Sequence, residues 1–212
     1  MLFRKIILPL LTLLSIWIST DLWFPRHHDL RQFDPVAIGV LETKMWRSYY
    51  EKKPLQLFWQ SAQLFRQQLK APFWRSFNIA YHAAKAAFIF QKGNSRVAYQ
   101  KALPDLQAFY QEVSKLSNRP LNVNQAARQE LEWWIIRRYR EEHPPEEWAK
   151  LQAQVAAEIY GVAPAQCEMY GKLRTKAMLY RDNLGERIGV RDWGRIEGML
   201  IGAWGSLENE LN

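Results

Sequence analysis

The sequence contains a single cysteine, Cys167, among its 212 residues. One cysteine excludes an intrachain disulfide and any zinc site built on several cysteine ligands. Residues that favour strands are also scarce, since threonine occurs four times and valine eight times. Alanine, leucine, glutamine, arginine, glutamate and lysine are plentiful instead, and all of them are good helix formers. The composition therefore predicts a helical protein that is not held together by disulfides.

Motifs typical of common enzyme classes are missing as well. The chain has no Gly-rich phosphate loop, no Gly-x-Ser-x-Gly and no His-Glu-x-x-His sequence. It also lacks Glu-x-x-His, the pattern that supplies ligands in di-metal carboxylate bundles. We therefore predict no catalytic residue, no metal ligand and no cofactor, and we favour a noncatalytic protein over an enzyme.

The first 24 residues predict a membrane anchor. Arg4 and Lys5 precede an apolar stretch over residues 6–24, which contains Trp17 and Trp23 near its far end. This stretch is about as long as the shortest spanning helices of ~17 residues. No Ala-x-Ala pattern follows it, so an uncleaved signal anchor is favoured over a cleaved signal peptide and over a buried core helix.

The charges on either side of this stretch predict its orientation. Lys and Arg are in excess on the N-terminal side, so we expect that end in the cytoplasm and the remaining chain in the periplasm or outside the cell. Residues 25–33 are interpreted as a polar juxtamembrane linker. Residues 34–212 are then expected to form a soluble helical domain.

Prolines and apolar periodicity divide this domain into helices. Glycine is nearly absent between Val40 and Tyr160, where Gly93 is the only one, and most breaks coincide with proline. Proline is tolerated in the first turn of a helix, so each can mark a start. We expect helices near 35–52, 54–70, 72–92, 95–117, 122–142, 145–160, 164–183 and 191–211. The predicted fold is an all-α closed bundle of seven or eight helices, favoured over a solenoid of helix pairs.

Several charged residues fall within the apolar arcs of these helices. Placed at 100° per residue, the inward-leaning or neighbouring charges are Glu42, Glu130, Glu132, Arg138, Glu158, Arg174 and Arg181. A charge inside a core must be paired, because desolvation otherwise costs several kcal/mol. We predict one buried network containing Glu42, Glu132 and Arg138. Its role is either to fix helix register or to bind a metal or move protons.

Glycines are concentrated near the C-terminus. Gly194, Gly198 and Gly202 recur every four residues on the last helix, with Gly205 close by. Each glycine inside a helix costs roughly 1 kcal/mol. A line of them predicts the close approach of something, and a neighbouring helix of the same domain is favoured over a partner protein or a second copy.

The net charge of +8 narrows the choice of partners. Nucleic acid is disfavoured, because no reading motif is present and the domain is expected outside the cytoplasm. We expect the surplus to face anionic lipid headgroups, through Arg26, His27, His28, Arg31, Lys44, Arg47, Lys52 and Lys53. The predicted function is a membrane-tethered accessory or assembly subunit that binds a membrane or envelope protein. The alternative is a bundle enzyme, or a ligand- or metal-binding protein, that uses the buried carboxylates.

Overall fold

The computed structural model describes residues 2–212, with side chains from residue 7 onward, and this part of the chain is all-α. Met1 and the side chains of residues 2–6 lie outside the described part, and with them Arg4 and Lys5, on which the predicted orientation depends. The helices are α1 (Leu2–Trp23), α2 (Pro35–Tyr50), α3 (Pro54–Leu69), α4 (Phe73–Lys92), α5 (Arg96–Gln100), α6 (Leu103–Ser114), α7 (Val123–Arg138), α8 (Pro145–Tyr160), α9 (Glu168–Leu184) and α10 (Val190–Leu211). Two short 3-10 helices, Pro164–Cys167 and Gly185–Arg187, flank α9.

Proline marks helix starts as the sequence predicted. Pro35, Pro54 and Pro145 each stand in the first turn of their helix, where a missing N–H costs nothing. At the start of α2 the Asp34 carboxylate accepts hydrogen bonds from the N–H groups of Val36 at 2.9 Å and Ala37 at 3.1 Å. This N-cap fixes the start of α2.

The expected helix over 95–117 is broken in two. The first piece is α5, which ends at Gln100, and α6 begins at Leu103 with Pro104 in its first turn. A proline cannot donate to the carbonyl four residues earlier, and its ring would clash with that carbonyl. The apolar stripe continues across the break, so periodicity alone did not predict it.

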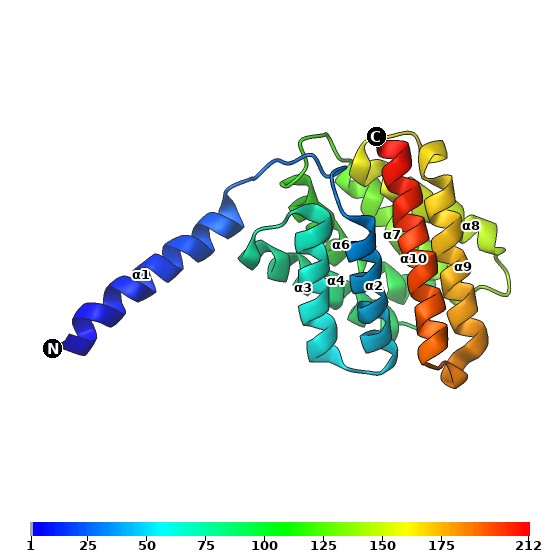
Figure 1. Cartoon of the computed structure of the whole chain (residues 1–212), viewed down its shortest axis with the longest axis horizontal. Coiled ribbons are helices and arrows are strands. Elements are labelled where there is room, and N and C mark those ends of the chain that lie inside the picture. Colours follow the sequence, from blue (N-terminus) through cyan, green and yellow to red (C-terminus); the bar gives the residue numbers. More distant parts are fainter. Residues whose placement is uncertain (1) are drawn as a thin grey trace.

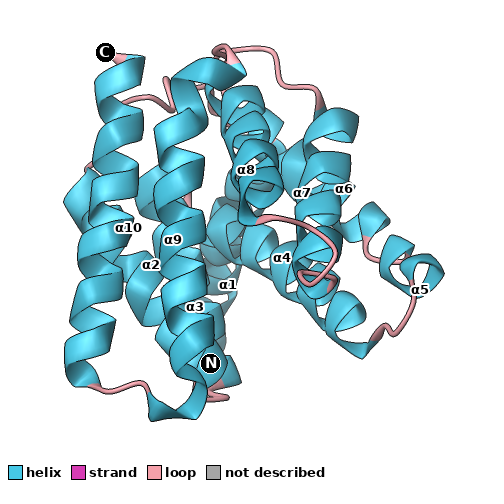
Figure 2. Ribbon diagram, turned by 90° about the vertical axis from the view of Figure 1, so that its right-hand side faces the viewer, coloured by secondary structure: helices cyan, strands magenta, loops and turns pink. Residues whose placement is uncertain are grey.

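The helices from α2 to α10 form a closed ring, apart from the short α5 beside α4 and α7. Each of the others packs against the next one along the chain, and α10 returns to pack against α2 (Figures 1 and 2). These helices therefore form the predicted closed bundle. A solenoid would have left the first and last helices apart.

Two glycines outside the predicted stripe lie at close contacts between helices. A Cβ built on Gly39 of α2 would lie 2.6 Å from Cγ1 and 2.8 Å from Cα of Ile201 on α10. A Cβ on Gly171 of α9 would collide with the backbone carbonyl of Ala149 on α8. These glycines allow the backbones of α2 and α10, and of α8 and α9, to approach closely.

Helix α1 stands apart from the ring. It projects from one side of the domain, beside α3 and the start of α4 (Figure 1). Its main helix contact is with α4, where Trp17 packs on Phe73 and Trp74 with both ring centroids at 5.6 Å. Within the described residues, no helix combines the length and the apolarity that crossing a membrane requires.

Candidate functional site: the apolar helix α1 and the buried polar clusters

The outer part of α1 exposes large apolar side chains on every side. Six of them are between 40% and 63% exposed: Leu8, Leu10, Leu11, Leu13, Leu14 and Ile16. At 100° per residue these positions surround the helix and do not form one stripe. A groove on a partner protein covers one stripe of a helix, whereas an apolar solvent covers its whole circumference.

Three of the four hydroxyl groups on this helix donate hydrogen bonds to carbonyls of the helix itself. Thr12 donates to the carbonyl of Leu8 at 3.0 Å, and Ser15 donates to the carbonyl of Leu11 at 2.8 Å. Thr20 donates in the same way to its own helix. A surrounding of hydrocarbon therefore leaves these three donors satisfied.

The C-terminal end of α1 is fixed to the domain through Asp21. This carboxylate is buried, and Oδ2 accepts a hydrogen bond from the backbone N–H of Trp74 at 3.2 Å. Its Oδ1 accepts from Arg26 at 3.1 Å. The start of α4 has no cap of its own, so Asp21 supplies the negative group that a helix N-terminus favours.

Arg75 of α4 holds the last turn of α1 and the residue that follows the helix. Its side chain is fully buried at 0% exposure, and Nη2 donates to the carbonyls of Leu22 at 2.7 Å and Phe24 at 2.9 Å. Its Nε lies 3.6 Å from the Glu112 carboxylate, which supplies the compensating charge. Burial lowers the pKa of the Arg75 guanidinium, although Glu112 opposes that shift. No pattern in the sequence indicated this role for Arg75.

Residues 25–33, expected to be a polar linker, are packed into the domain. The N–H of His28 donates to Leu116 at 2.7 Å, and the carbonyl of His28 accepts from Asn118 at 2.9 Å. Leu30 and Phe33 are buried in the core. Arg31 donates to the carbonyls of Tyr160 and Gly161 at the end of α8. The connection between α1 and the ring is therefore an ordered part of the domain.

A charged cluster inside the ring contains Glu42, Arg174, Tyr170 and Trp204. Glu42 is 2% exposed, and its two oxygens accept hydrogen bonds from Arg174 and, at 2.7 Å, from Nε1 of Trp204. Arg174 also donates to the hydroxyl of Tyr170 at 2.7 Å. Despite burial, Glu42 and Tyr170 keep the pKa of Arg174 above its ordinary value. The cluster links α2, α9 and α10, and the sequence predicted two of its members.

Glu130 forms a second cluster with aromatic donors. Its Oε1 accepts from Nε1 of Trp134 at 2.9 Å, and its Oε2 accepts from the Tyr110 hydroxyl at 3.1 Å. Burial raises the pKa of the Glu130 carboxyl, and these hydrogen bonds together with Arg174 partly oppose the shift. This cluster ties α7 to α6.

The other predicted members do not join these clusters. Glu132 lies at the surface and pairs with Arg96 at 2.6 Å. Arg138 is exposed, and its guanidinium stands 5.2 Å from the centroid of the Phe90 ring. Arg138 has the angular position of Leu131 but is the last residue of α7, so its side chain leaves the core. The prediction of one buried network with Glu42, Glu132 and Arg138 is therefore wrong, and Glu158 takes no part in these hydrogen bonds.

Arg181 belongs to a third cluster that the sequence did not reveal. Its guanidinium carbon lies 3.3 Å from the centroid of the Tyr50 ring, and it contacts Asp182 at 3.6 Å. Arg137 completes the cluster by donating to Asp182 at 2.8 Å and to the Tyr50 hydroxyl at 3.3 Å. Arg137 and Asp182 stand at helix ends, where apolar periodicity carries little information.

The glycines of α10 make no close helix contact within the described chain. A Cβ on Gly194, Gly198 or Gly205 would meet no heavy atom within 4 Å, and one on Gly202 would lie 3.9 Å from Leu173. The preferred interpretation, internal helix packing, is therefore wrong. These glycines lie on the outer side of α10, whereas Trp193, Ile196 and Leu200 are buried on the side that faces the interior of the bundle. A partner or a second copy at this face stays a prediction.

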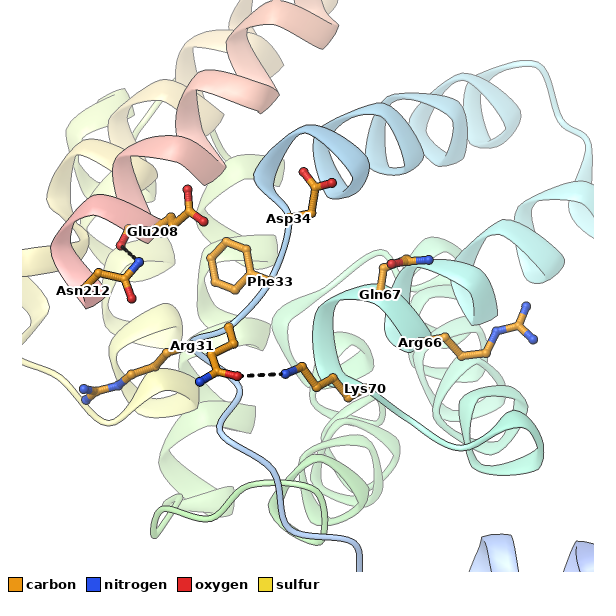
Figure 3. A pocket seen from close by; sticks show the side chains of 9 residues that line it. Arg31, Phe33, Asp34, Arg66, Gln67, Lys70, Glu208 and Asn212 are labelled. Carbon is orange, nitrogen blue, oxygen red and sulfur yellow. Dashed lines mark hydrogen bonds between the residues drawn. The ribbon is translucent and has the colours of Figure 1, made fainter.

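The pocket of Figure 3 lies where the ends of α3 and α10 meet the start of α2 and has a volume of about 500 Å³. Charges of both signs line it, including Asp34, Arg66 and Glu208. Its polar groups serve the fold: Asp34 caps α2, and Lys70 donates to Gln32 at 3.5 Å (Figure 3). No group of three or more His, Cys, Asp or Glu in the described part of the chain is placed to hold a metal ion.

The comparisons with known proteins add no relative: no protein-family model, no curated protein and no solved structure matches this chain. Inference about function therefore rests on the geometry of α1, of its attachment and of the buried clusters.

Proposed function

We propose that the protein is a membrane-tethered, noncatalytic helical module whose α1 inserts into lipid. The domain after α1 serves as an accessory or assembly subunit for a membrane or envelope protein. The observation that carries this proposal is the outer part of the projecting α1, residues 8–16, whose exposed apolar side chains surround the helix.

The energy of the exposed side chains supports a lipid environment. Full burial of a large apolar side chain is worth about 1.5–3 kcal/mol. Six half-exposed side chains on α1 therefore forfeit on the order of 5–10 kcal/mol in water, which is comparable to the total stability of a domain. Insertion into hydrocarbon recovers this free energy, and the hydroxyls of Thr12, Ser15 and Thr20 already donate hydrogen bonds within the helix.

The attachment of α1 supports a role in positioning. Asp21, Arg26 and Arg75 hold the end of α1 and the residues after it through several hydrogen bonds. A flexible tether would only keep the domain near the membrane. This fixed junction would instead hold the domain in one orientation toward a membrane partner.

The hydrogen bonds of Glu42, which is buried, and of Glu130, which is half-buried, support a structural role for both carboxylates. Each oxygen of Glu42 and of Glu130 accepts a hydrogen bond from a protein donor. Carboxylates that act on a ligand need an oxygen directed toward it. Fixing the register of neighbouring helices is the use that these contacts favour.

For the topology, we propose a single pass with the N-terminus in the cytoplasm and the domain in the periplasm or outside the cell. The test is carbonate extraction and protease treatment of membranes that carry the full chain. We expect the protein to stay in the membrane and the domain to be digested only from the outer side. Leu13→Glu on α1 should release the chain from the membrane. The matched control, Val97→Glu on α5, should leave the chain bound to the membrane.

Two results would contradict the proposal. Release of the unmodified chain by carbonate would show that α1 is not in lipid. Stoichiometric iron or manganese in the purified full chain would support the metal-binding alternative. If neither result is found, affinity purification from native membranes would identify the partner protein.

A further inference from the structure

The positive charge of the chain is concentrated in one segment. Residues 52–104 contain nine Lys and Arg but not a single Asp or Glu, whereas the rest of the chain has 20 Lys and Arg and 21 Asp and Glu. The net charge of +8 therefore arises entirely from this segment. It folds as α3, α4 and α5, and α3 with the start of α4 forms the side of the domain from which α1 projects (Figure 1).

Aromatic rings connect α1 to α3 across this side. Trp17 of α1 packs on Phe73 at 5.6 Å, and Phe73 packs on Phe77 at 5.1 Å. Phe77 in turn lies 5.5 Å from Trp59 on α3. The apolar surface of α1 is therefore continued on the domain.

The outer edge of this row is exposed and carries a cation. Leu55 is 86% exposed and Trp59 is 48% exposed, both on α3. The guanidinium of Arg66 lies 5.8 Å from the Trp59 centroid and 5.2 Å from the Phe73 centroid. No carboxylate of the described residues forms an ion pair with Arg66. An arginine flanked by tryptophan and phenylalanine suits a headgroup region, where the rings face hydrocarbon and the charge faces phosphate.

We propose that this face, formed by Leu55, Trp59, Arg66, Phe73 and Phe77, lies on an anionic lipid surface. The proposal rests on the proposed insertion of α1 and adds a second membrane contact to it. One helix in lipid and one face on the headgroups would together fix how the domain is turned.

Lipid fits this face better than a protein partner for two reasons. The ring contacts make the face continuous with α1, so insertion of α1 brings it to the membrane surface. Anionic headgroups also match Arg66, because each unpaired cation near such a surface strengthens binding. Four of the nine cations of the segment pair instead with acids outside it, namely Lys53, Arg75, Lys85 and Arg96.

Several cations that we expected to face lipid form ion pairs or hydrogen bonds within the protein. Arg26 pairs with Asp21 at 3.1 Å, and Arg31 donates to two backbone carbonyls. Arg47 and Lys53 both pair with Glu51 at 2.6 Å. Arg66 is therefore the better candidate for a lipid phosphate.

The test measures the depth of single positions in vesicles that contain the full chain. Leu55→Cys, Leu13→Cys and Val190→Cys variants are labelled with a polarity-sensitive fluorophore, and the unsubstituted chain gives the background from the buried Cys167. The vesicles are phosphatidylcholine alone or mixed with phosphatidylglycerol, with quenchers in the headgroup or in the acyl chain. Val190 is the control, because it is 77% exposed and lies on α10 across the domain from α1.

We expect quenching at Leu13 from the acyl chain, quenching at Leu55 from the headgroup, and none at Val190. Phosphatidylglycerol should increase the signal at Leu55. Arg66→Gln should lower the ratio of docked to undocked protein about fivefold, the effect of one surface charge. Arg191→Gln on α10, which removes the same charge far from this face, should leave that ratio unchanged.

Other outcomes would overturn the proposal in distinguishable ways. If Leu13 is quenched but Leu55 behaves like Val190, the anchor stands and the docked face is wrong. If Leu13 is not quenched either, the proposed insertion of α1 fails together with the docked face. If the Leu55 label is shielded in native membranes but not in protein-free vesicles, a protein covers this face.

Discussion

The same substitution at two helical glycines should change stability in opposite directions. Gly39 in α2 and Gly198 in α10 both occupy helix interiors, so replacement by alanine should gain about 1 kcal/mol from helix propensity in each case. What differs is the space around the new Cβ. At Gly198 nothing lies within 4 Å, whereas at Gly39 the Cβ would lie 2.6–2.8 Å from three atoms of Ile201.

The contact at Gly39 cannot be relieved by a side-chain rotation. Two of the three Ile201 atoms, N and Cα, belong to the backbone of α10. Restoring ordinary contact distances therefore requires α2 and α10 to separate by several tenths of an ångström or more. Such overpacking costs about 1–3 kcal/mol, and the immobile backbone places Gly39→Ala toward the upper end. After the propensity gain we expect a net loss of about 2 kcal/mol at Gly39 and a gain of about 0.5–1 kcal/mol at Gly198.

The assay is denaturant unfolding of the full chain in a mild detergent, with both variants measured beside the unsubstituted protein. Separation of α2 from α10 should also lengthen the hydrogen bond from Trp204 to Glu42, now 2.7 Å. The indole N–H resonance of Trp204 should therefore shift in Gly39→Ala and stay in place in Gly198→Ala. Equal stabilisation by both substitutions would show that α2 and α10 are not in close contact, and the reasoning would fail.

The polar groups give four further predictions. Arg174→Met should cost about 3–5 kcal/mol, the scale for breaking a buried pair, and adding Glu42→Gln should recover part of that loss in a double-mutant cycle. Arg75→Met should loosen the junction, so that brief proteolysis cuts between α1 and α2 before the ring is digested. Burial raises the pKa of Cys167 to about 11, so its thiol should react with iodoacetamide near pH 8 only after unfolding. The pKa of the Glu130 carboxyl is raised in the folded chain, so its protonated form stabilises the fold at acid pH. This stabilisation is lost as the pH rises through the folded-state pKa, and Glu130→Gln should flatten that dependence.

Each of these predictions has a contradicting result. Simple additivity of the Arg174 and Glu42 changes would mean that the pair is not coupled. Unchanged cleavage in Arg75→Met would place the strength of the junction elsewhere. Rapid alkylation of the folded chain would show that Cys167 is accessible, and an unaltered pH profile in Glu130→Gln would assign the pH dependence to other groups.

The sequence predicted most helix boundaries because their causes are local. A proline in the first turn or an aspartate before it acts within a few residues, so α2, α3 and α8 begin where the sequence indicates. The break between α5 and α6 has an equally local cause in Pro104. It was missed because the regular apolar stripe was given more weight than the proline.

The candidate sites were harder to predict because they depend on contacts between distant residues. Glu42 could be placed in an apolar arc, but its partners Arg174 and Trp204 lie 132 and 162 residues further along. Arg138 shows that the angular position on a helix does not by itself predict burial. Its angle matches that of the buried Leu131, but it is the last residue of α7 and its side chain is exposed. Arg75 carries no sequence signal, yet it is fully buried and donates to carbonyls in the last turn of α1 and just after it.

The glycines show why spacing alone does not identify a helix contact. A repeat of four residues on α10 and a single glycine on α2 are both compatible with close packing, and only the position of the neighbouring backbone distinguishes them. The ring closes through Gly39, so the repeat on α10 is left facing outward. If α1 is inserted and α3 rests on lipid, α10 lies on the part of the domain farther from the anchor (Figure 1). The junction at Asp21 and Arg75 would then hold the glycine face of α10 in one fixed orientation relative to the membrane, which a flexible linker could not do.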